Sequence, residues 1–417
     1  MLDTSDQLQP LLDDPYSVSL DKLDPSLAEL FRHQKHHAVF KRLREEDPIH
    51  FTPNSPFGPF WSITKYADIV AVDGDHKRFS NEPDNTIGDS PDGFQTPQFL
   101  AMDPPRHTPQ RQAAQGAVSP KQLSELEPLI RRRVQAILDA LPRNEEFNWV
   151  DLVSREMTMR MLATLFDIPQ EDRHLLTLWS DTAVTTAQFG VEGVDEEARI
   201  AILLEALEYF QAVWKDRASK PPQADFISLL AHNPNTVGMH ERPMELMGNL
   251  MLLIIGGNDT TRNSASSGVV ALNENPAEYD KLRADRALIP NMVSEIIRWQ
   301  TPLSHMRRTA KEDVELGGKT IAKGDKVVMW YCSGNRDEDA IPQANRFLID
   351  RPMARRHVSF GFGIHRCMGN RIAEAQLRIL WEEIMRRFDR IEVVGEPVRV
   401  SSNMVNGFDE VRVRIPG

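Results

Sequence analysis

Residues 360–369 read Phe-Gly-Phe-Gly-Ile-His-Arg-Cys-Met-Gly, and they contain Cys367, one of only two cysteines in the chain. Glycine permits a positive φ and lets the backbone approach a flat ligand closely. Apolar residues at helical spacing follow the loop, so Cys367 is predicted to lie in a turn that enters a helix. Backbone N–H groups and the helix dipole favour a thiolate over a thiol at such a position.

A lone cysteine is usually a small buried apolar residue, and this interpretation is kept for Cys332. At Cys367 the neighbouring Phe360, Gly363 and Gly369 favour a functional interpretation instead. A thiolate held in a turn of this kind is suited to be the axial ligand of a haem iron, onto which it pushes electron density.

The composition indicates an ordinary globular protein. The chain has 417 residues, of which 41% are hydrophobic and 26% are charged. The longest notable apolar run, residues 250–257, is far shorter than the roughly 20 residues of a membrane span. The N-terminus has no pattern of a secretory signal, and the low cysteine content suits a reducing compartment, so a cytoplasmic protein is expected. A net charge of −12 argues against nucleic-acid binding.

A second informative stretch lies in a long helix that is predicted over residues 244–273 and ended by Asn275-Pro276. Its centre contains Gly256-Gly257, followed by Asp259-Thr260. Each glycine in a helix is less favourable than alanine by about 1 kcal/mol, so an opened turn or close contact with a cofactor is expected here. The acid and the alcohol are then expected to face the opened turn. The alternative is a simple kink with Asp259 on a solvated face.

Other patterns are weaker when taken alone. His107 and Arg111 lie four residues apart and share one helix face, which is otherwise a common solvated pattern. Glu295 and Arg298 form an i, i+3 pair, which is common on helix surfaces and individually worth little. Residues 81–100 form a long segment rich in Pro, Gly and Asp, with Phe94, Phe99 and Leu100 as its apolar side, and such segments are often lids or binding loops.

Taken together and in this order, the His-x3-Arg, Gly-Gly-x-Asp-Thr, Glu-x-x-Arg and Cys-loop motifs resemble those of the cytochromes P-450, over about residues 40–417. Runs such as 256–263 and 365–371 are similar to the soluble bacterial alkane terminal hydroxylases of that family. The resemblance implies a mainly α fold with a smaller β region and a long central helix over one haem b. It also implies one domain over residues 41–417, after a lead segment 1–40.

The resemblance implies a role for each matched residue. Cys367 would be the iron ligand, and Asp259 with Thr260 would deliver protons during catalysis. Glu295 and Arg298 would form a buried structural cluster whose third member is best matched by Arg346. The cofactor would be bound by His107, Arg111, Gly256, Arg308, Phe360, His365, Cys367 and Gly369, with Arg307 competing for the place of Arg308. The substrate site would be lined by Leu252, Ile255, Gly256, Leu303, Met306, Met404 and Val405. The alternative for these residues is ordinary packing in the hydrophobic core.

The expected activity is that of a haem-thiolate monooxygenase that inserts one oxygen atom of O2 into the terminal C–H bond of medium-chain alkanes or similar aliphatic chains. A fatty-acid, terpene or sterol hydroxylase of the same fold is the alternative within the family. A haem sensor without turnover is the alternative outside catalysis, and the Asp259-Thr260 pair argues against it.

The electrons are expected from separate proteins, because the chain carries no flavin or iron–sulfur motif. A ferredoxin with its NAD(P)H-dependent reductase is the implied source. Despite the acidic net charge, Arg355, Arg356, Arg366 and Arg371 gather around the Cys loop, and such a basic patch suits an acidic partner.

Overall fold

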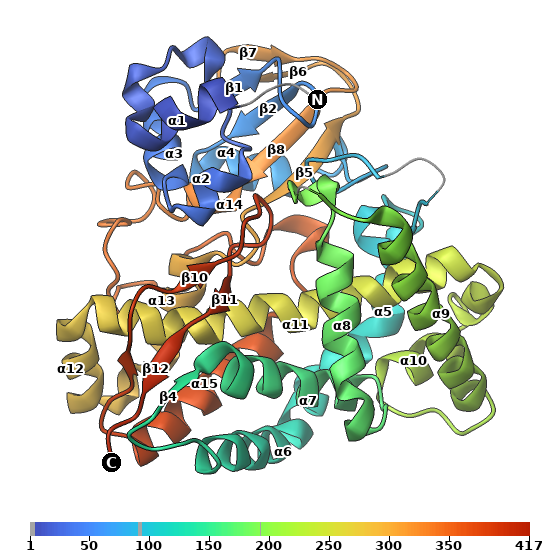
Figure 1. The fold of residues 1–417 in the computed structure, drawn as a ribbon. Helices are drawn as coiled ribbons and strands as arrows, with labels where there is room; N and C mark the ends of the chain where they lie inside the picture. Colours follow the sequence, from blue (N-terminus) through green and yellow to red (C-terminus); the bar gives the residue numbers. More distant parts are fainter. Residues whose placement is uncertain (1–4, 91–93, 192) are drawn as a thin grey trace.

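The computed structural model describes residues 5–90, 94–191 and 193–417, and it is mainly helical with a smaller β region (Figure 1). The expected fold class is therefore confirmed. Residues 91–93 of the predicted 81–100 loop lie outside the described part of the chain.

The elements follow one another along the chain with short connections. The helices are α1 Ser5–Asp13, α2 Ala28–Arg32, α3 His36–Glu46, α4 Tyr66–Gly74, α5 His107–Gln115, α6 Pro120–Asp139, α7 Glu156–Leu165, α8 Arg173–Val184, α9 Glu196–Ala218, α10 Phe226–His232, α11 Pro243–Glu274, α12 Pro276–Ala284, α13 Ile289–Gln300, α14 Tyr331–Gly334 and α15 Asn370–Arg387. The strands are β1 Ile49–Thr52, β2 Phe60–Ile63, β3 Phe79–Ser80, β4 Glu146–Asn148, β5 His305–Ala310, β6 Val314–Leu316, β7 Lys319–Ile321, β8 Lys326–Trp330, β9 Glu392–Val393, β10 Val398–Arg399, β11 Phe408–Glu410 and β12 Arg412–Arg414.

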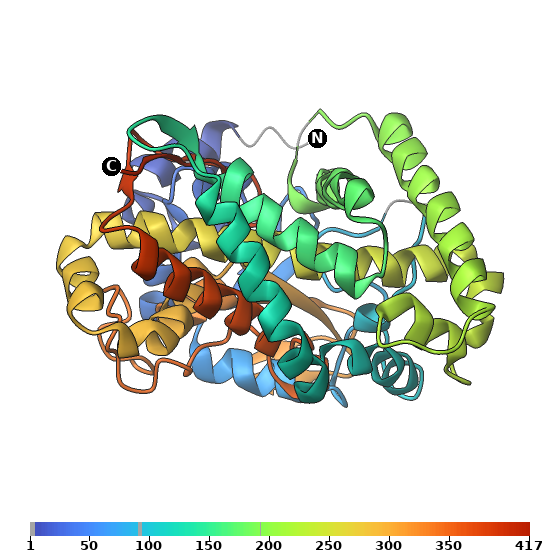
Figure 2. The ribbon, with the colours of Figure 1, turned by 90° about the horizontal axis from the view of Figure 1, so that it is seen from below.

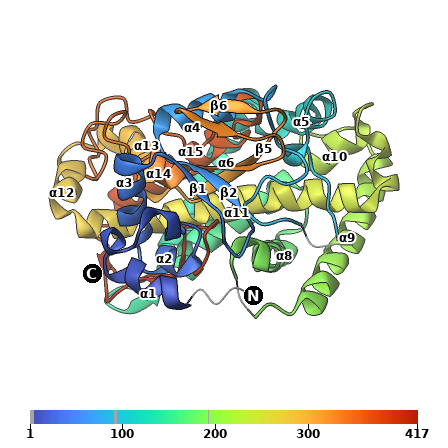
Figure 3. The same ribbon diagram turned by 90° about the horizontal axis from the view of Figure 1, so that it is seen from above.

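Helix α11 runs through the middle of the molecule in all three views (Figures 1, 2 and 3). It spans Pro243–Glu274, one residue longer at each end than the sequence pattern predicts. Proline at its first position and Asn275-Pro276 after its end set its limits, because proline starts a helix well and cannot continue one. Helices α7, α8, α13 and α15 pack against it, so most of its length is buried.

The main sheet lies above α11 in the orientation of Figure 1, and Figure 3 shows its strands crossing over the helix. Its strand order is β1-β2-β8-β5-β3, and β2 pairs with β8 in parallel while the other pairs are antiparallel. In the β5–β8 pair, Arg308 lies opposite Val327. Strand β5 was not predicted from the sequence, although it carries Met306 and Arg308 to the edge of the site.

The N-terminal helices are part of the fold and not an appendage. Leu11, Leu30 and Phe40 share a hydrophobic core with Phe60 of β2 and Trp330 of β8. The boundary that the sequence suggests between residues 40 and 41 falls inside α3, His36–Glu46.

Below α11, helix α15 packs against α6 and α13, and Figure 2 shows α6 and α15 crossing there. The predicted apolar stripe of α15 is buried at Ile372, Leu380 and Ile384. Strands β10 and β11 form a hairpin, and an isolated bridge joins Leu303 to Val405 near its tip. Within the described residues no helix is both long and apolar enough to cross a membrane.

Candidate functional site

The Cys loop folds into a tight turn immediately before α15. The N–H of Cys367 donates to the carbonyl of Phe360 at 2.8 Å, which closes the turn. Gly363 has a φ of +67°, and a Cβ there would lie 2.7 Å from the carbonyl oxygen of Asp73. Only glycine fits this position without strain. The predicted placement of Cys367 in a turn at a helix N-terminus is therefore confirmed.

Asp73, at the end of α4, anchors this loop from behind. Its Oδ2 accepts hydrogen bonds from the N–H of Phe362 at 2.7 Å and from the Tyr331 hydroxyl at 2.8 Å. Its Oδ1 forms an ion pair with Arg308, and both side chains are buried. Sequence reasoning missed Asp73 and Tyr331, because neither belongs to a motif and both lie far from the loop along the chain.

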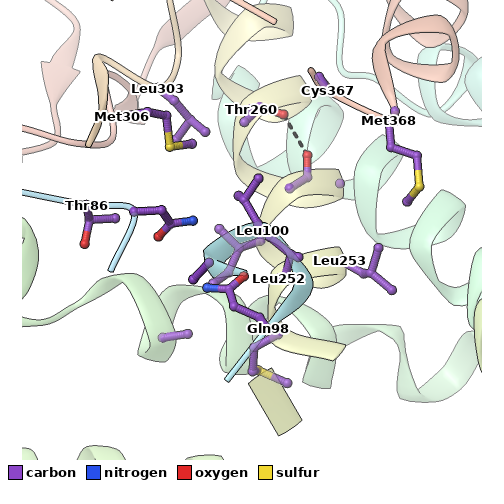
Figure 4. Close-up of a pocket in the computed structure, with 18 of the residues that line it drawn as sticks. Thr86, Gln98, Leu100, Leu252, Leu253, Thr260, Leu303, Met306, Cys367 and Met368 are labelled. Carbon is purple, nitrogen blue, oxygen red and sulfur yellow. Dashed lines mark hydrogen bonds between the residues drawn. The ribbon is translucent and has the colours of Figure 1, made fainter. Parts of the chain in front are cut away.

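A cavity of about 570 Å³ extends from Cys367 along α11 toward the loop of residues 82–100 (Figure 4). It is lined by all seven residues proposed for substrate: Leu252, Ile255, Gly256, Leu303, Met306, Met404 and Val405. It is also lined by Arg111, Arg308, Phe360, His365, Cys367 and Gly369 of the predicted cofactor set. One cavity therefore brings together groups from α5, α11, β5, the Cys loop and the C-terminal hairpin.

The two glycines of α11 have different neighbours. A Cβ on Gly256 would meet nothing within 4 Å, because this residue faces the cavity. A Cβ on Gly257 would lie 2.6 Å from Cδ2 of the buried Leu162. Gly256 therefore leaves room inside the cavity, whereas Gly257 allows α7 to pack closely against α11.

Thr260 faces the cavity on the side of Cys367, as the sequence predicts (Figure 4). Its hydroxyl donates to the carbonyl of Gly256 at 2.8 Å, one turn earlier in the helix. Threonine side chains inside helices commonly donate in this way to the backbone carbonyl four residues earlier. Thr260 is therefore a polar group placed in the wall of a largely apolar cavity.

Asp259 does not share this orientation. Helix α11 is continuous through Gly256-Gly257, so the expectation that both residues face an opened turn is wrong. The Asp259 side chain is fully buried and faces α8, where Ser180 donates to it at 2.9 Å. Arg262, one turn later, pairs with it at 2.6 Å and also reaches Asp181 at 2.9 Å. The reason is helical geometry, since neighbouring residues point about 100° apart. Burial raises the pKa of the Asp259 carboxyl, although Arg262 opposes this shift.

The basic residues beside the Cys loop fit the propionates of a haem. Arg308 lines the cavity, whereas Arg307 instead pairs with Asp89 at 2.6 Å, so the geometry favours Arg308 of the two competing residues. His107 does not line the cavity but lies behind His365, with 4.2 Å between the ring centroids. Nε2 of His107 and both ring nitrogens of His365 are buried without a hydrogen-bond partner among the described residues.

These unpartnered nitrogens are the test of fit for the cofactor. Buried polar groups are normally hydrogen-bonded, so they imply a polar ligand beside them. Burial lowers the pKa of His107 to about 4, with Arg111 acting in the same direction, so its ring is neutral near pH 7. Arginine and neutral histidine N–H groups together are suitable donors to carboxylate groups. The residues present therefore fit a haem with its thiolate ligand at Cys367.

The electrostatic surroundings of Cys367 only partly follow the expectation. Cys367 is exposed and borders the cavity, and desolvation of its sulfur by the neighbouring protein atoms raises the pKa of the thiol. The N–H groups of Gly369 and Asn370 and the charges of Arg111 and Arg366 act in the expected, opposite direction. Cys367 would hold the haem iron as a thiolate, and the charge of the bound metal would favour loss of the thiol proton.

The predicted Glu-x-x-Arg cluster is present, but the prediction of its third residue is wrong. Glu295 and Arg298 are fully buried and pair at 2.7 Å. The third cation is Arg351, whose Nε lies 2.9 Å from Glu295, and not Arg346. The Arg346 side chain is exposed and donates to Gln343, while only its carbonyl accepts from Arg298 and Arg351. The chain turns after Phe347, and this turn brings residue 351 back to the cluster.

Residues 82–86, 90 and 94–100 contribute more of the cavity lining than the apolar residues of this segment alone suggested. Phe94, Phe99 and Leu100 line it as expected, and Thr86 and Gln98 add polar groups that sequence reasoning missed. Gly248 of α11 makes this possible, because a Cβ there would lie 2.4 Å from the carbonyl oxygen of Pro97. A glycine near the start of a predicted central helix was the available signal for this close approach.

Comparison with known proteins agrees with this geometry. The sequence model of the family described as cytochrome P-450 matches residues 195–405. Linalool 8-monooxygenase from Pseudomonas putida is 34% identical over 406 residues, which cover 94% of this chain and 99% of that protein.

Solved structures of the same family are similar to this chain at higher sequence identity. A cytochrome P-450 of type 153 from Novosphingobium aromaticivorans is 43% identical, with a TM-score of 0.89, over 94% of this chain and 99% of that one. CYP153D17 from Sphingomonas sp. PAMC 26605 is 42% identical, with a TM-score of 0.88, over 96% of this chain and 100% of that one. The Cys loop, the central helix with Thr260 in the cavity wall and the buried Glu295–Arg298 pair agree with these similarities, and the chain belongs to the cytochromes P-450, the monooxygenases that carry a haem b.

Proposed function

We propose that this monooxygenase hydroxylates the terminal carbon of medium-chain alkanes or similar aliphatic chains. One oxygen atom of O2 is inserted into a terminal C–H bond to give C–OH, and the other oxygen atom is released as water. The reaction consumes two electrons, which partner proteins supply, and two protons. The bound haem supplies the activation of O2. The similarity of the chain to the alkane terminal hydroxylases, and to the two structures of type 153, supports this choice.

The observation that carries the proposal is the apolar lining of the cavity. Leu252 and Ile255 of α11, with Leu303 and Met306, give its inner part aliphatic walls. A methyl C–H bond is stronger than the neighbouring methylene bonds, so an enzyme that attacks the chain end must orient the substrate against its intrinsic reactivity. Orientation of this kind is what a narrow apolar site provides.

Thr260 and Asp259 are proposed to deliver the protons, in different ways. The Thr260 hydroxyl lies in the cavity wall and can pass a proton to a group bound beside Cys367. The Asp259 carboxyl lies on the other side of α11, where burial raises its pKa and Ser180 and Arg262 hold it. Because burial raises its pKa while Arg262 opposes this shift, the carboxyl can take up and release a proton and so relay one. The acid therefore requires a rotation or a bridging water to reach Thr260.

The electrons are proposed to come from a ferredoxin that binds beside the Cys loop. Arg355, Arg366 and Arg371 line a hollow on the surface, and Phe360 lines both this hollow and the inner cavity. Glu127 and Glu374 line the same hollow, and Glu374 lies 3.4 Å from Arg355, whereas the Arg366 and Arg371 side chains are exposed. The separate reductase and the cytoplasmic location belong to the same proposal.

Incubation with NADH, a surrogate ferredoxin and reductase, and n-octane tests the proposal directly. Gas chromatography should find mostly 1-octanol. Mostly 2-, 3- or 4-octanol from protein with intact haem would leave the family assignment in place and exclude the terminal position.

A second candidate is terpene hydroxylation, and the similarity to linalool 8-monooxygenase favours it. The relatives named methyl-branched lipid omega-hydroxylase, 29% identical in Mycobacterium tuberculosis, point instead to chain ends. A competition between n-octane and linalool in the same assay separates the two candidates by the ratio of their kcat/KM values.

A further inference from the structure

Arg336, which follows α14, is a buried guanidinium that forms no ion pair with a carboxylate among the described residues. It is only 7% exposed. Its Cζ lies 3.4 Å from the ring centroid of Trp299, and its Nη2 makes one long hydrogen bond, 3.4 Å, to the carbonyl of the same residue. Glu295 is a nearby acid, but it already pairs with Arg298 and Arg351. A buried charge without a paired opposite charge is unfavourable and requires an explanation.

Two further arginines of the same region also lack a carboxylate ion pair within the described part of the chain. Arg44 of α3 is buried, and its Nη1 donates to the Ser333 hydroxyl at 2.8 Å and to the carbonyl of that residue at 3.3 Å. The same carbonyl accepts from the N–H of Arg336 at 2.9 Å, so the two arginines meet at Ser333. Arg399 of β10 is half-buried, with its Cζ 4.4 Å from the ring centroid of Phe408.

His36, the first residue of α3, connects these arginines. Burial lowers the pKa of its ring to about 3, and the charges of Arg336 and Arg399 act in the same direction, so both arginines lie near it. Its Nε2 is buried without a hydrogen-bond partner among the described residues. The hydroxyl of Ser401, two residues after Arg399, donates to Glu29 of α2 at 2.8 Å. In the view of Figure 1, β10 accordingly lies between α2 and α13.

The acids near this cluster do not neutralise it. Glu274 and Glu396 act on Arg399, but both side chains are exposed and neither forms an ion pair with it. Asp337 acts on Arg44 in the same way, yet its carboxylate instead accepts from the N–H of Tyr66 at 2.9 Å. The cluster therefore holds an excess of positive charge in a largely buried place.

We propose that Arg44, Arg336 and Arg399 form a binding site for a phosphate-type oxyanion at the junction of the N-terminal helices, α14 and β10. Guanidinium groups keep their charge and bind such ions through paired N–H donors. The remaining nitrogens of Arg336 are not sealed off inside the protein, so a small ion can reach them. None of the three arginines lines the haem cavity, although Met404 and Val405 of the cavity follow β10. The bound anion stabilises the packing of the N-terminal helices on this C-terminal segment.

Isothermal titration calorimetry of the haem-loaded protein with inorganic phosphate, in chloride buffer at constant ionic strength, tests the site. We expect a single phosphate to bind to each chain, and Kd to rise roughly tenfold or more in Arg399→Gln, because charge-assisted hydrogen bonds are lost. Arg399 is chosen because it is less buried than Arg336. Arg399→Lys keeps the charge without the paired donors, so its Kd should lie between the two. Arg371→Gln, at an exposed arginine beside the Cys loop, is the matched control and should leave Kd within about twofold.

Thermal unfolding gives a second measure. Phosphate should raise the midpoint of the wild type above its value in chloride at equal ionic strength, because a ligand that binds only the folded state stabilises it. The rise should be lost in Arg399→Gln. Equal midpoints in the two salts, an unchanged Kd in Arg399→Gln, or a loss of binding in Arg371→Gln in its place would overturn the proposal. Glycerol 3-phosphate in a parallel titration identifies the source of the ion, since tighter binding than that of inorganic phosphate assigns the site to phosphate monoesters and weaker binding to the free ion.

Discussion

At the scale of single residues, neighbours in sequence can have unrelated surroundings. Asp259 and Thr260 follow each other on α11, yet the acid lies in an ion-pair network with α8 and the alcohol lies in the cavity. A residue that lines the cavity can touch the reacting atoms. A residue on the other side of the helix acts only through another group. Substitutions of Asp259 and of Thr260 are therefore expected to affect the reaction in different ways.

For Thr260→Ala we expect haem binding to persist and product formed per NADH to fall by about tenfold, since proton delivery by a positioned group is lost. The missing electrons should appear as hydrogen peroxide. The measurement is the ratio of NADH consumed to product and peroxide formed, with Thr260→Ser as the variant that keeps the hydroxyl. Unchanged coupling in Thr260→Ala would show that this hydroxyl has no role in proton delivery.

The correction of the buried cluster can be tested with two matched variants. Arg351→Met removes a cation from buried Glu295 and should lower the free energy of unfolding by about 3–5 kcal/mol. Arg346→Met removes an exposed side chain and should change it by no more than about 0.5 kcal/mol. The midpoints of urea unfolding of the two proteins provide the comparison. Equal midpoints would mean that the ion pair at Arg351 contributes nothing.

At the scale of elements, helix α11 combines two functions in adjacent positions. Gly257 allows contact with Leu162 of α7, and Gly256 leaves space inside the cavity one residue earlier. Both glycines lower the intrinsic stability of the helix by about 1 kcal/mol relative to alanine. The helix therefore gives up some local stability to close packing on one side and to space for bound groups on the other.

Substitution of each glycine by alanine should separate these functions. Gly256→Ala meets no atom, so the thermal midpoint should stay or rise slightly, while octane turnover falls because the cavity narrows near Thr260. Gly257→Ala forces Leu162 to move and should lower the free energy of unfolding by about 1 kcal/mol. If the product position and rate of Gly256→Ala match the wild type across chain lengths, then Gly256 does not border the substrate.

At the scale of the whole molecule, charge is distributed unevenly. The net charge is −12, yet the face beside the Cys loop exposes Arg355, Arg356, Arg366 and Arg371. A basic face on a protein of negative net charge attracts an acidic partner locally, which orients the encounter.

Charge reversal on this face should therefore slow reduction by an acidic ferredoxin. The double variant Arg355→Glu, Arg371→Glu should lower the second-order rate about 10- to 100-fold at low salt, with a smaller difference at high salt. The control is Arg412→Glu, Arg414→Glu on exposed positions of β12, which changes the net charge equally on the β4-β12-β9 sheet. Stopped-flow reduction measures both. Rates that do not depend on salt would contradict docking at the basic face.

The amino-acid sequence by itself determined the family, the turn that places Cys367 before a helix and the limits of α11 to within one residue. These features depend on local spacing, because a turn, a cap or a helix face is set by residues within a few positions of one another. Only the tertiary structure decided that Arg351 completes the cluster at Glu295, that Asp73 holds the Cys loop, and that Gln98 lines the cavity. Each of these contacts joins segments far apart along the chain, where packing and not spacing selects the partner.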